Sequence, residues 1–558
     1  MKHILKGTNL FFVGIFFLIV WSTIITYRQH VSYPLEYYEG IYLSVARNIH
    51  EIGYPIEPVG EKGEFFLGHP HFGLFDLALW ESLFSLDFVS IRLFHMLTWF
   101  LPLIVLFFLF GKKLSNLWSG LLAVFWAISD SFILHNAMLT KIDVPLMTMF
   151  TLFFFLFYLF YEKVDGKIFI RWLALGVIFA FAALTKYQAT LVMIPMSVIF
   201  VKRYFVDKAI EWDNLWKMAL GFFIGALFVM VPWFLYCTWG GGEIISVVSA
   251  RIHQITHFDP MEYRNTAPIL DYWKILFNQI GFPLIFVFII SVCLGLRTMT
   301  LKKDSFILLM VWIITVLVFF SFISTKSLTG RYFLPLVPPL ILLSSQVISE
   351  KLSRHLMIIC LALAIIVSIV LQTVHKTDYS HLVDYGHLLF ICSIFLVGLV
   401  LWIFMPYFHL KIFNYFLVGY LALLIGIQGT WFRPVSAETR QKIPIEYASV
   451  WIKKNTKKGD PVLTNVPQIG YFADRNYIFT QYDRTGEGIL NLLDNRRIKV
   501  VYLDLHLFDT EFFDMNLPSE KKRSIISKIE SQFDLVAKVD KPRSVLLFKR
   551  KEAKGISQ

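Results

Sequence analysis

Charged residues are scarce in this sequence. Lysine, arginine, aspartate and glutamate make up 16% of its 558 residues, whereas soluble domains usually carry about 25%. Hydrophobic residues make up 56%. This balance excludes an ordinary soluble enzyme and predicts a membrane protein. The formal net charge of +12 gives no reason to expect nucleic acid as a partner, because positive charge in a membrane protein mostly reports orientation.

Cysteine is also rare, and its spacing forms no motif. The four cysteines lie in or beside apolar runs and include no C-x-x-C pair: Cys237, Cys293, Cys360 and Cys392. The sequence therefore predicts neither a disulfide framework nor a cysteine zinc site.

Long apolar runs dominate what is present. Runs of about 17–25 residues can cross a bilayer, and they predict about thirteen transmembrane helices near 9–27, 88–110, 116–135, 144–161, 168–184, 188–201, 215–237, 279–296, 306–324, 333–349, 356–374, 386–405 and 413–431. The first run follows Lys2 and Lys6 without a small-residue cleavage site, so we expect an uncleaved anchor.

The short loops predict how these helices are oriented. With the N-terminus in the cytoplasm, basic residues gather in the inner loops and are few in the outer ones, as expected from the positive-inside rule. The C-terminal segment is then outside. Two outer loops, 28–87 and 238–278, far exceed the usual median of about 4–6 residues. Long ordered loops on one side of a bundle commonly carry function.

The composition changes after Pro434. We expect a polytopic membrane domain over 1–436 and a small extracytoplasmic α/β domain over 437–558. Its predicted helices are Pro444–Asn455, Gly488–Asn495 and one that begins at Ser519; its predicted strands are Pro461–Thr464, Lys499–Leu503, Leu535–Val539 and Val545–Phe548. The domain has no glycine-rich phosphate loop, so we expect it to cap the bundle or hold an acceptor.

The first outer loop opens with a stretch of helical periodicity that begins at Tyr37. Ile41 and Val45 fall on one face, and Glu39 and Arg47 fall on the other. Such a helix should lie on the membrane surface and present Glu39 to the lipid–water boundary. The alternative is a connector whose charges simply face water.

Further polar residues lie at predicted outer span ends, where ionisable groups tend to be functional. Asp143 precedes the fourth span and could instead be an N-cap. Lys186 lies in a tight outer turn and could instead extend to lipid headgroups. His69 and His71 have metal-ligand spacing but no third ligand in register, so structural contacts are the favoured interpretation. The other candidates are Tyr42, Arg92, His257, Arg264, Arg331 and Tyr332.

Together these residues suit one chemistry. Cations would stabilise the phosphate that leaves a lipid-linked donor. A carboxylate would take the proton of the acceptor. The lipid tail would lie between spans.

Several motifs, in this order, resemble a known family: Tyr38-Glu39-x-x-Tyr42-x-x-x-x-Arg47, Gly68-His69-Pro70-His71-Phe72-Gly73, Arg92, Asp143-Val-Pro-Leu, Leu184-Thr185-Lys186-Tyr187 and Gly330-Arg331-Tyr332-Phe333-Leu334-Pro335. The sequence is similar to the GT-C glycosyltransferases of the protein O-mannosyltransferase type (family 39-like), which include bacterial aminoarabinose transferases acting on lipid A. The layout of many spans followed by an outer α/β domain is similar too.

The resemblance implies an inverting transferase that moves a sugar from polyprenyl phosphate to a lipid A, glycan, lipid or protein acceptor. By position, Glu39 and Asp143 are the catalytic acids. The donor phosphate would meet Lys186, Arg331 and Arg92, while the acceptor or loop-site candidates are Tyr42, Arg47, His69, His71, His257, Arg264 and Tyr332. No cofactor is predicted, and a divalent cation is left open.

One position departs from the family. An acidic pair is usual in the first loop, and Tyr38 stands where its first member would be. Glu39 then acts alone, shares the work with Asp143, or belongs to a protein without activity. The competing functions are a transporter or flippase for a lipid-linked sugar, an oligosaccharyltransferase-like enzyme, and an assembly factor that kept the fold. The resemblance favours a bacterial inner membrane.

Overall fold

The structure is a computed structural model. It describes residues 37–58, 60, 63–66, 69–84, 87–163, 165–240, 280, 282–297, 303–321, 330–351, 444–479, 487–495, 497–504, 519–539 and 545–551.

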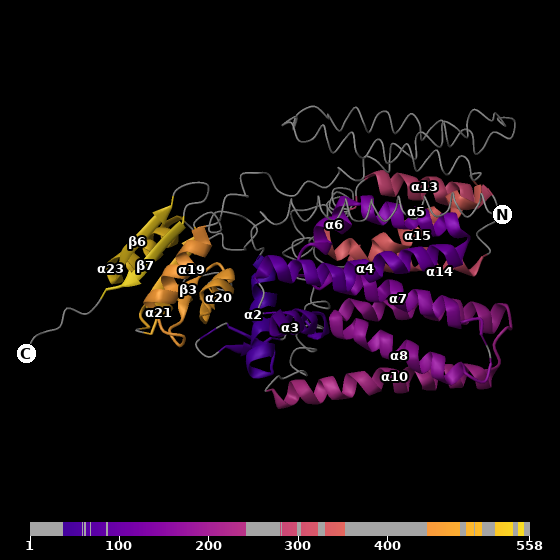
Figure 1. Cartoon of the computed structure of the whole chain (residues 1–558), viewed down its shortest axis with the longest axis horizontal. Helices are drawn as coiled ribbons and strands as arrows, with labels where there is room; N and C mark the ends of the chain where they lie inside the picture. The colour runs from indigo at the N-terminus through magenta and orange to yellow at the C-terminus, as the bar shows by residue number, and fades with distance from the viewer. Residues whose placement is uncertain are drawn as a thin grey trace, which may run out of the picture. The chain divides into compact units, whose positions relative to one another are not determined.

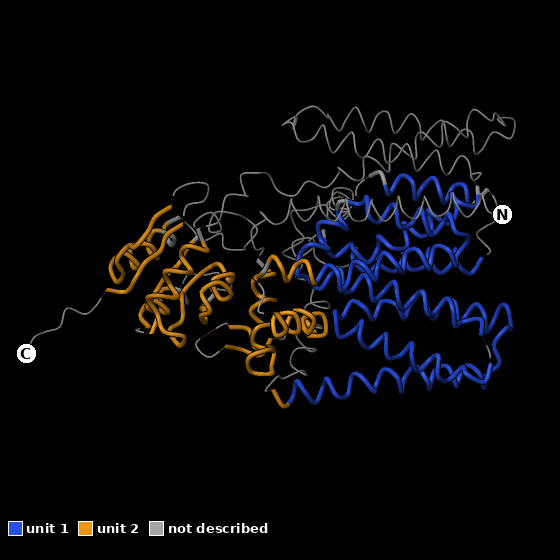
Figure 2. Tube along the Cα trace, in the orientation of Figure 1, with its two compact units in different colours: residues 1–27, 95–238, 243–434 blue, residues 28–94, 239–242, 435–558 orange. Residues whose placement is uncertain are grey.

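The chain divides into two compact units (Figure 2). Unit 1 consists of residues 1–27, 95–238 and 243–434, and unit 2 consists of residues 28–94, 239–242 and 435–558. Unit 2 therefore joins the first long loop of the sequence to its C-terminal segment. The expected domain boundary at residue 436 stays a prediction.

The described part of unit 1 is helical (Figure 1). Its described elements are the greater part of α4 (Phe88–Leu114), then α5 (Leu117–Ser129), α6 (Ser131–Ala137), α7 (Asp143–Phe160), α8 (Ile168–Thr185), η1 (Tyr187–Val192), α9 (Met193–Val201), η2 (Lys202–Val206), α10 (Trp212–Trp239), α13 (Phe282–Arg297), α14 (Asp304–Ser321), η5 (Gly330–Leu336) and α15 (Val337–Lys351).

Six stretches of helix in the described residues are long and apolar enough to cross a membrane: Val89–Leu114, Asp143–Phe160, Ile168–Thr185, Tyr187–Val206, Trp212–Trp239 and Arg331–Glu350. Each coincides with a predicted span. The spans expected at 9–27, 356–374, 386–405 and 413–431 lie outside the described residues, so the count of thirteen stays a prediction.

The span expected at 116–135 is divided in two. Asp130 has extended backbone angles and ends α5, and its side chain accepts a hydrogen bond from the Ile133 amide to cap α6. A side-chain cap of this kind competes with helix continuation. The span expected at 333–349 also begins differently, as the 3₁₀ helix η5, which contains Pro335.

The helices of unit 1 pack closely through aromatic residues and glycines. Phe154 of α7 lies 4.1 Å from Trp312 of α14, measured between ring centroids. Between α8 and α10 the backbones approach so closely that a Cβ atom at Gly176 would lie 2.0 Å from the Phe222 carbonyl oxygen. A Cβ atom at Gly225 would lie 2.0 Å from the Leu173 carbonyl oxygen. Small residues permit this approach of membrane helices.

Unit 2 contains two helices and a hairpin from the first loop, followed by a mixed sheet with its own helices. The loop supplies α2 (Tyr37–Ile52), β1 (Ile56–Glu57), β2 (Glu64–Phe65) and α3 (Phe72–Phe84). The C-terminal segment supplies α19 (Pro444–Asn455), β3 (Val462–Thr464), α20 (Gln468–Ala473), β4 (Tyr477–Phe479), α21 (Glu487–Leu493), β5 (Val500–Asp504), α23 (Ser519–Gln532), β6 (Phe533–Val539) and β7 (Val545–Arg550).

The sheet has the strand order β4-β3-β5-β7-β6, with β3 parallel to β4 and β5, and β7 antiparallel to β5 and β6. Successive side chains of a strand point to opposite faces. Accordingly Val501 and Leu503 pack with Ile525 and Ile529 of α23. On the other face, residues of β3, β5 and β7 pack with α19 and α20.

The loop hairpin is joined to the edge strand β4. The Tyr477 amide donates to the Pro58 carbonyl oxygen (2.8 Å), and the Gly60 amide donates to the Tyr477 carbonyl oxygen (2.9 Å). The Tyr477 hydroxyl donates to the Glu57 carboxylate (2.8 Å). An exposed strand edge is thereby covered by the first loop.

The elements predicted for the C-terminal segment agree with the structure at α19, α21, α23 and the strands β3, β5, β6 and β7. The helix α20 and the strand β4 were not predicted.

We predict that Gly225→Ala destabilises the protein by about 1–3 kcal/mol, because the added methyl group must separate α8 from α10. Gly166→Ala is the matched control, since a Cβ atom there would meet nothing within 4 Å. Thermal unfolding of both variants in detergent is the measurement. Equal midpoints would contradict the packing argument.

Candidate functional site

Glu39 and Arg92 form a buried ion pair in unit 2. The Arg92 Nε atom donates to Glu39 Oε1 at 2.8 Å, and its Nη2 atom donates to Glu39 Oε2. The side chains are 0% and 3% exposed. A guanidinium that binds both oxygens of a carboxylate fixes the orientation of both groups.

This burial corrects the expected exposure of α2. The helix forms over Tyr37–Ile52, but its predicted polar face is covered at Glu39. The alternative in which the charges of this segment all face water is therefore wrong for Glu39. Arg92 was expected at the donor phosphate; its contact in the structure is with the acid, and its phosphate role stays a prediction.

Asp143 and Lys186 form a second buried pair, in unit 1. The Lys186 Nζ atom donates to Asp143 Oδ1 at 2.7 Å, and the side chains are 5% and 2% exposed. Asp143 is the first residue of α7, and Lys186 directly follows α8. The pair therefore joins one end of α7 to one end of α8.

Arg331 completes this cluster. Its Nη1 atom lies 3.9 Å from Asp143 Oδ2, and that carboxylate oxygen has no hydrogen-bond partner in the described part of the chain. The Lys186 Nζ atom lies 4.4 Å from the ring centroid of Tyr332, a distance at which a cation is attracted to an aromatic ring. We call Asp143, Lys186, Arg331 and Tyr332 the cation cluster.

The cluster decides between two sequence alternatives. Asp143 is not the N-cap of α7, because Ile142 occupies that position and the Asp143 carboxylate bonds to Lys186. Lys186 does not extend to lipid headgroups, because its ammonium is buried against Asp143. Both charges are directed at each other inside the protein.

The start of α7 is also fixed against α4. His95 bonds through Nε2 to the Lys141 carbonyl oxygen at 3.1 Å. The Thr148 hydroxyl donates to the Trp99 carbonyl oxygen at 3.0 Å. Asp143 lies in sequence between Lys141 and Thr148, so these two bonds help to fix its position.

Tyr42, His69 and His71 lie in unit 2 among aromatic side chains. The Tyr42 ring contacts those of Tyr38, Phe66 and His69. The His71 Nε2 atom donates to the Phe66 carbonyl oxygen at 2.6 Å. Among the described residues, no group of three or more His, Cys, Asp or Glu side chains could hold a metal ion.

Of the three remaining predicted site residues, the structure describes one. Arg47 contacts Glu81, Tyr471 and Asp474, partners that lie far from it in sequence and that the sequence analysis did not identify. His257 and Arg264 lie outside the described residues.

The two buried arrangements can do different chemistry. Each Glu39 oxygen accepts a hydrogen bond from Arg92, and a carboxylate oxygen can accept more than one hydrogen bond. The cation cluster has two positive groups beside one carboxylate. Such cations can bind either the carboxylate or a phosphate.

Part of the chain is similar in sequence to a known protein family. Residues 68–236 match the family model described as dolichyl-phosphate-mannose-protein mannosyltransferase. No curated protein sequence matches the chain. The residues that match the family model make up less than half of the chain.

The solved structures extend the likeness to almost the whole chain. ArnT from Cupriavidus metallidurans in the apo state has a TM-score of 0.61 at 16% identity, over 96% of this chain and 98% of that one. The same protein bound to undecaprenyl phosphate gives 0.60 at 14% identity, over 96% and 98%. The archaeal oligosaccharyltransferase AglB from Archaeoglobus fulgidus, in complex with an inhibitory peptide and a dolichol-phosphate, gives 0.55 at 10% identity, over 94% and 72%. They confirm the fold resemblance drawn from the sequence.

We predict that acidification destabilises unit 2 through His71. Burial lowers the pKa of His71 from 6.5 to about 4, so the folded state holds the neutral ring while the unfolded state takes up a proton below pH 6.5. The contribution is complete above the unfolded pKa and declines as the pH falls towards 4, with a loss of about 2 kcal/mol between pH 7 and pH 5.

Thermal unfolding at pH 7 and pH 5 measures this effect. His71→Gln is the control, because its amide can still donate to the Phe66 carbonyl oxygen but does not titrate. The variant should show a smaller pH dependence than the unmodified protein. An identical dependence would remove His71 as its source.

Proposed function

Because the chain has the GT-C fold of the ArnT and protein mannosyltransferase type, we propose that it is a membrane glycosyltransferase. It moves a sugar from a polyprenyl-phosphate donor to a lipid, glycan or protein acceptor on the outer face of the membrane. The N-terminus is then cytoplasmic and the C-terminal segment extracytoplasmic, in a cell inner membrane.

The observation that carries the proposal is the cation cluster. Asp143 and Lys186 are almost fully buried, and both lie at predicted outer span ends. Removing charges from water is unfavourable, and replacing a buried pair by apolar residues often improves stability. A substrate that uses the pair would account for this unfavourable burial.

A lipid phosphate suits the cluster as that substrate. Lys186 and Arg331 would contact the phosphate oxygens, with Tyr332 beside both cations. One solved relative in fold is bound to undecaprenyl phosphate, and another to a dolichol-phosphate. These ligands support a polyprenyl-phosphate sugar as the donor here.

The proposed reaction is a single displacement. The acceptor oxygen attacks the anomeric carbon and forms the new glycosidic bond, while the bond from that carbon to the phosphate oxygen breaks. The acceptor proton passes to a carboxylate, and polyprenyl phosphate leaves with the electron pair. Attack opposite the leaving group inverts the anomeric configuration.

The two acids have different partners and so different proposed roles. Glu39, held through both oxygens by Arg92, orients the acceptor hydroxyl and receives its proton. Asp143 holds Lys186 until the donor phosphate takes over that contact.

The first test uses the purified full-length protein with a panel of radiolabelled polyprenyl-phosphate sugars. We expect turnover of one donor, and a loss of about 10²–10⁴-fold in rate for Glu39→Gln, the range typical of a general base. Glu39→Gln leaves the buried charge of Arg92 without its carboxylate, which can destabilise the variant. Rates are therefore compared per amount of folded, monodisperse protein. Full activity of Glu39→Gln would overturn its assignment; donor binding without turnover would favour a carrier or an inactive relative.

We predict that Lys186→Gln weakens donor binding by about 2–3 kcal/mol, because it removes a charged contact to phosphate but keeps a hydrogen-bond donor for Asp143. Lys303→Gln is the control, since this lysine is half exposed and pairs with Glu350. A donor titration that gives the same affinity for both variants would contradict the phosphate role.

A further inference from the structure

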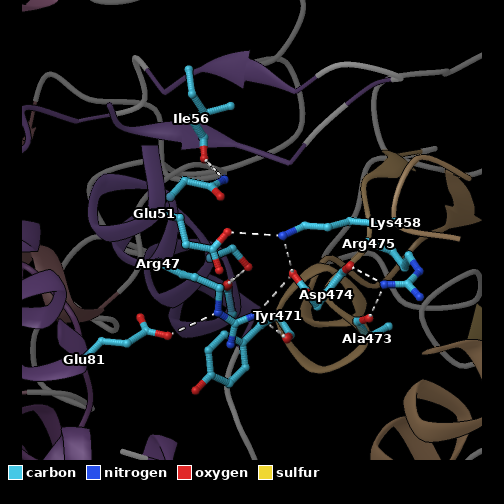
Figure 3. Close-up of polar contacts among 12 residues, drawn as sticks. Arg47, Glu51, Ile56, Glu81, Lys458, Tyr471, Ala473, Asp474 and Arg475 are labelled. Atoms are coloured by element: carbon cyan, nitrogen blue, oxygen red, sulfur yellow. Dashed lines mark hydrogen bonds and ion pairs between the residues drawn. The ribbon is translucent and has the colours of Figure 1, made fainter. Parts of the chain in front are cut away.

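Arg47 of α2 contacts three residues that lie far from it in sequence (Figure 3). Its Nε atom lies 3.1 Å from Glu81 Oε1, and its Nη1 atom donates to the Tyr471 carbonyl oxygen at 3.0 Å. Its guanidinium carbon lies 4.5 Å from the ring centroid of Tyr471, and Nη1 lies 3.8 Å from Asp474 Oδ1. This one residue connects α2 to α3 and to the end of α20.

The other end of α20 also contacts α2. A Cβ atom at Gly40 would lie 2.9 Å from the Gln468 Cα atom, so only a glycine allows the two backbones to approach this closely. Gly40 is next to Glu39 in sequence. The short helix α20 therefore begins beside the proposed catalytic acid and ends at Arg47, about two turns further along α2.

The turn that contacts Arg47 is held by hydrogen bonds to Arg475. Asp474 adopts the left-handed backbone conformation, with φ of 54°, which aspartate and asparagine tolerate better than most residues. Arg475 donates to the Asp474 carbonyl oxygen (2.8 Å) and to the Thr456 carbonyl oxygen (2.8 Å). The Asp474 carboxylate is thus presented by a fixed turn.

We propose that Arg47 is a positioning residue for the transfer reaction. It holds α2 against α20, and α2 in turn sets the place of Glu39 and its pairing with Arg92. The inference rests on the proposed function, because it gives Glu39 a substrate. Arg47 does not itself touch the reacting atoms.

A second set of contacts distinguishes positioning from simple stability. The β1–β2 hairpin is bound to β4 through Tyr477, by two backbone hydrogen bonds and by its hydroxyl to Glu57. These contacts hold the hairpin and do not involve α2. Asn48 of α2 also donates to the Ile56 carbonyl oxygen of β1 at 2.6 Å. Loss of Arg47 should therefore weaken the contact of α2 with the C-terminal end of α20, while the hairpin stays attached to β4.

The test compares Arg47→Ala with Tyr477→Phe in the full-length protein, with rates expressed per folded molecule. For Arg47→Ala we expect kcat to fall about 10- to 100-fold, the effect of a displacement of about 1 Å at a reacting group, with the donor KM within about threefold. Tyr477→Phe removes a contact in the same unit and should change kcat less than about twofold. Equal kcat losses in the two variants would reduce Arg47 to a structural role and overturn the proposal.

A conservative variant and a second readout complete the test. Asp474→Asn keeps the turn but removes the carboxylate, and should shift kcat in the same direction by a smaller factor. Hydrogen exchange of the α2 amides should rise in Arg47→Ala and stay unchanged in Tyr477→Phe. Hydrogen exchange needs no substrate, so it tests the inference separately from the proposed function. If the unmodified protein transfers no sugar, the proposed function fails. If α2 exchange is unchanged in Arg47→Ala, the positioning role is overturned.

Discussion

A charge buried away from water has to be paired, and this constraint governs both candidate arrangements. Asp143 and Lys186 lie at the ends of different helices, so their pairing joins α7 to α8, and Arg331 adds η5 to the same point. Removing one member would leave an uncompensated charge, which typically costs about 3–5 kcal/mol. The arrangement of these helix ends and the chemistry of the cluster thus depend on the same ion pair.

The Glu39–Arg92 pair applies the same constraint to the first loop, at a position where the resembled family usually has two acids. By the resemblance, Tyr38 stands where the first acid is expected, and its ring packs with that of Tyr42. An aromatic contact is therefore present where a second carboxylate was expected. A single acid oriented by an arginine is consistent with the proposed transfer, in which one proton has to be accepted.

Helices and strands were predictable where a periodic pattern extended over many residues. This held for α2, α4, α7, α8, α10 and the strands β5 and β7. The break at Asp130 and the short helix α20 were not, because a single side-chain cap or fewer than two helical turns leave no periodic signal. The sequence predicted candidate acids and cations but not their pairing, and their roles stay predictions. Glu39 with Arg92 and Arg47 with Tyr471 are set by tertiary contacts that sequence spacing does not encode.

The pairing of the first loop with β4 has a consequence for the order of assembly. Glu57 and Tyr477 are 420 residues apart, and ribosomes add about 5–20 residues per second. The early hairpin therefore waits for about 20–80 s before the strand that completes it is made. During synthesis it exposes unpaired backbone groups and an unclosed loop. A chaperone or the membrane surface has a defined interval in which to protect this segment.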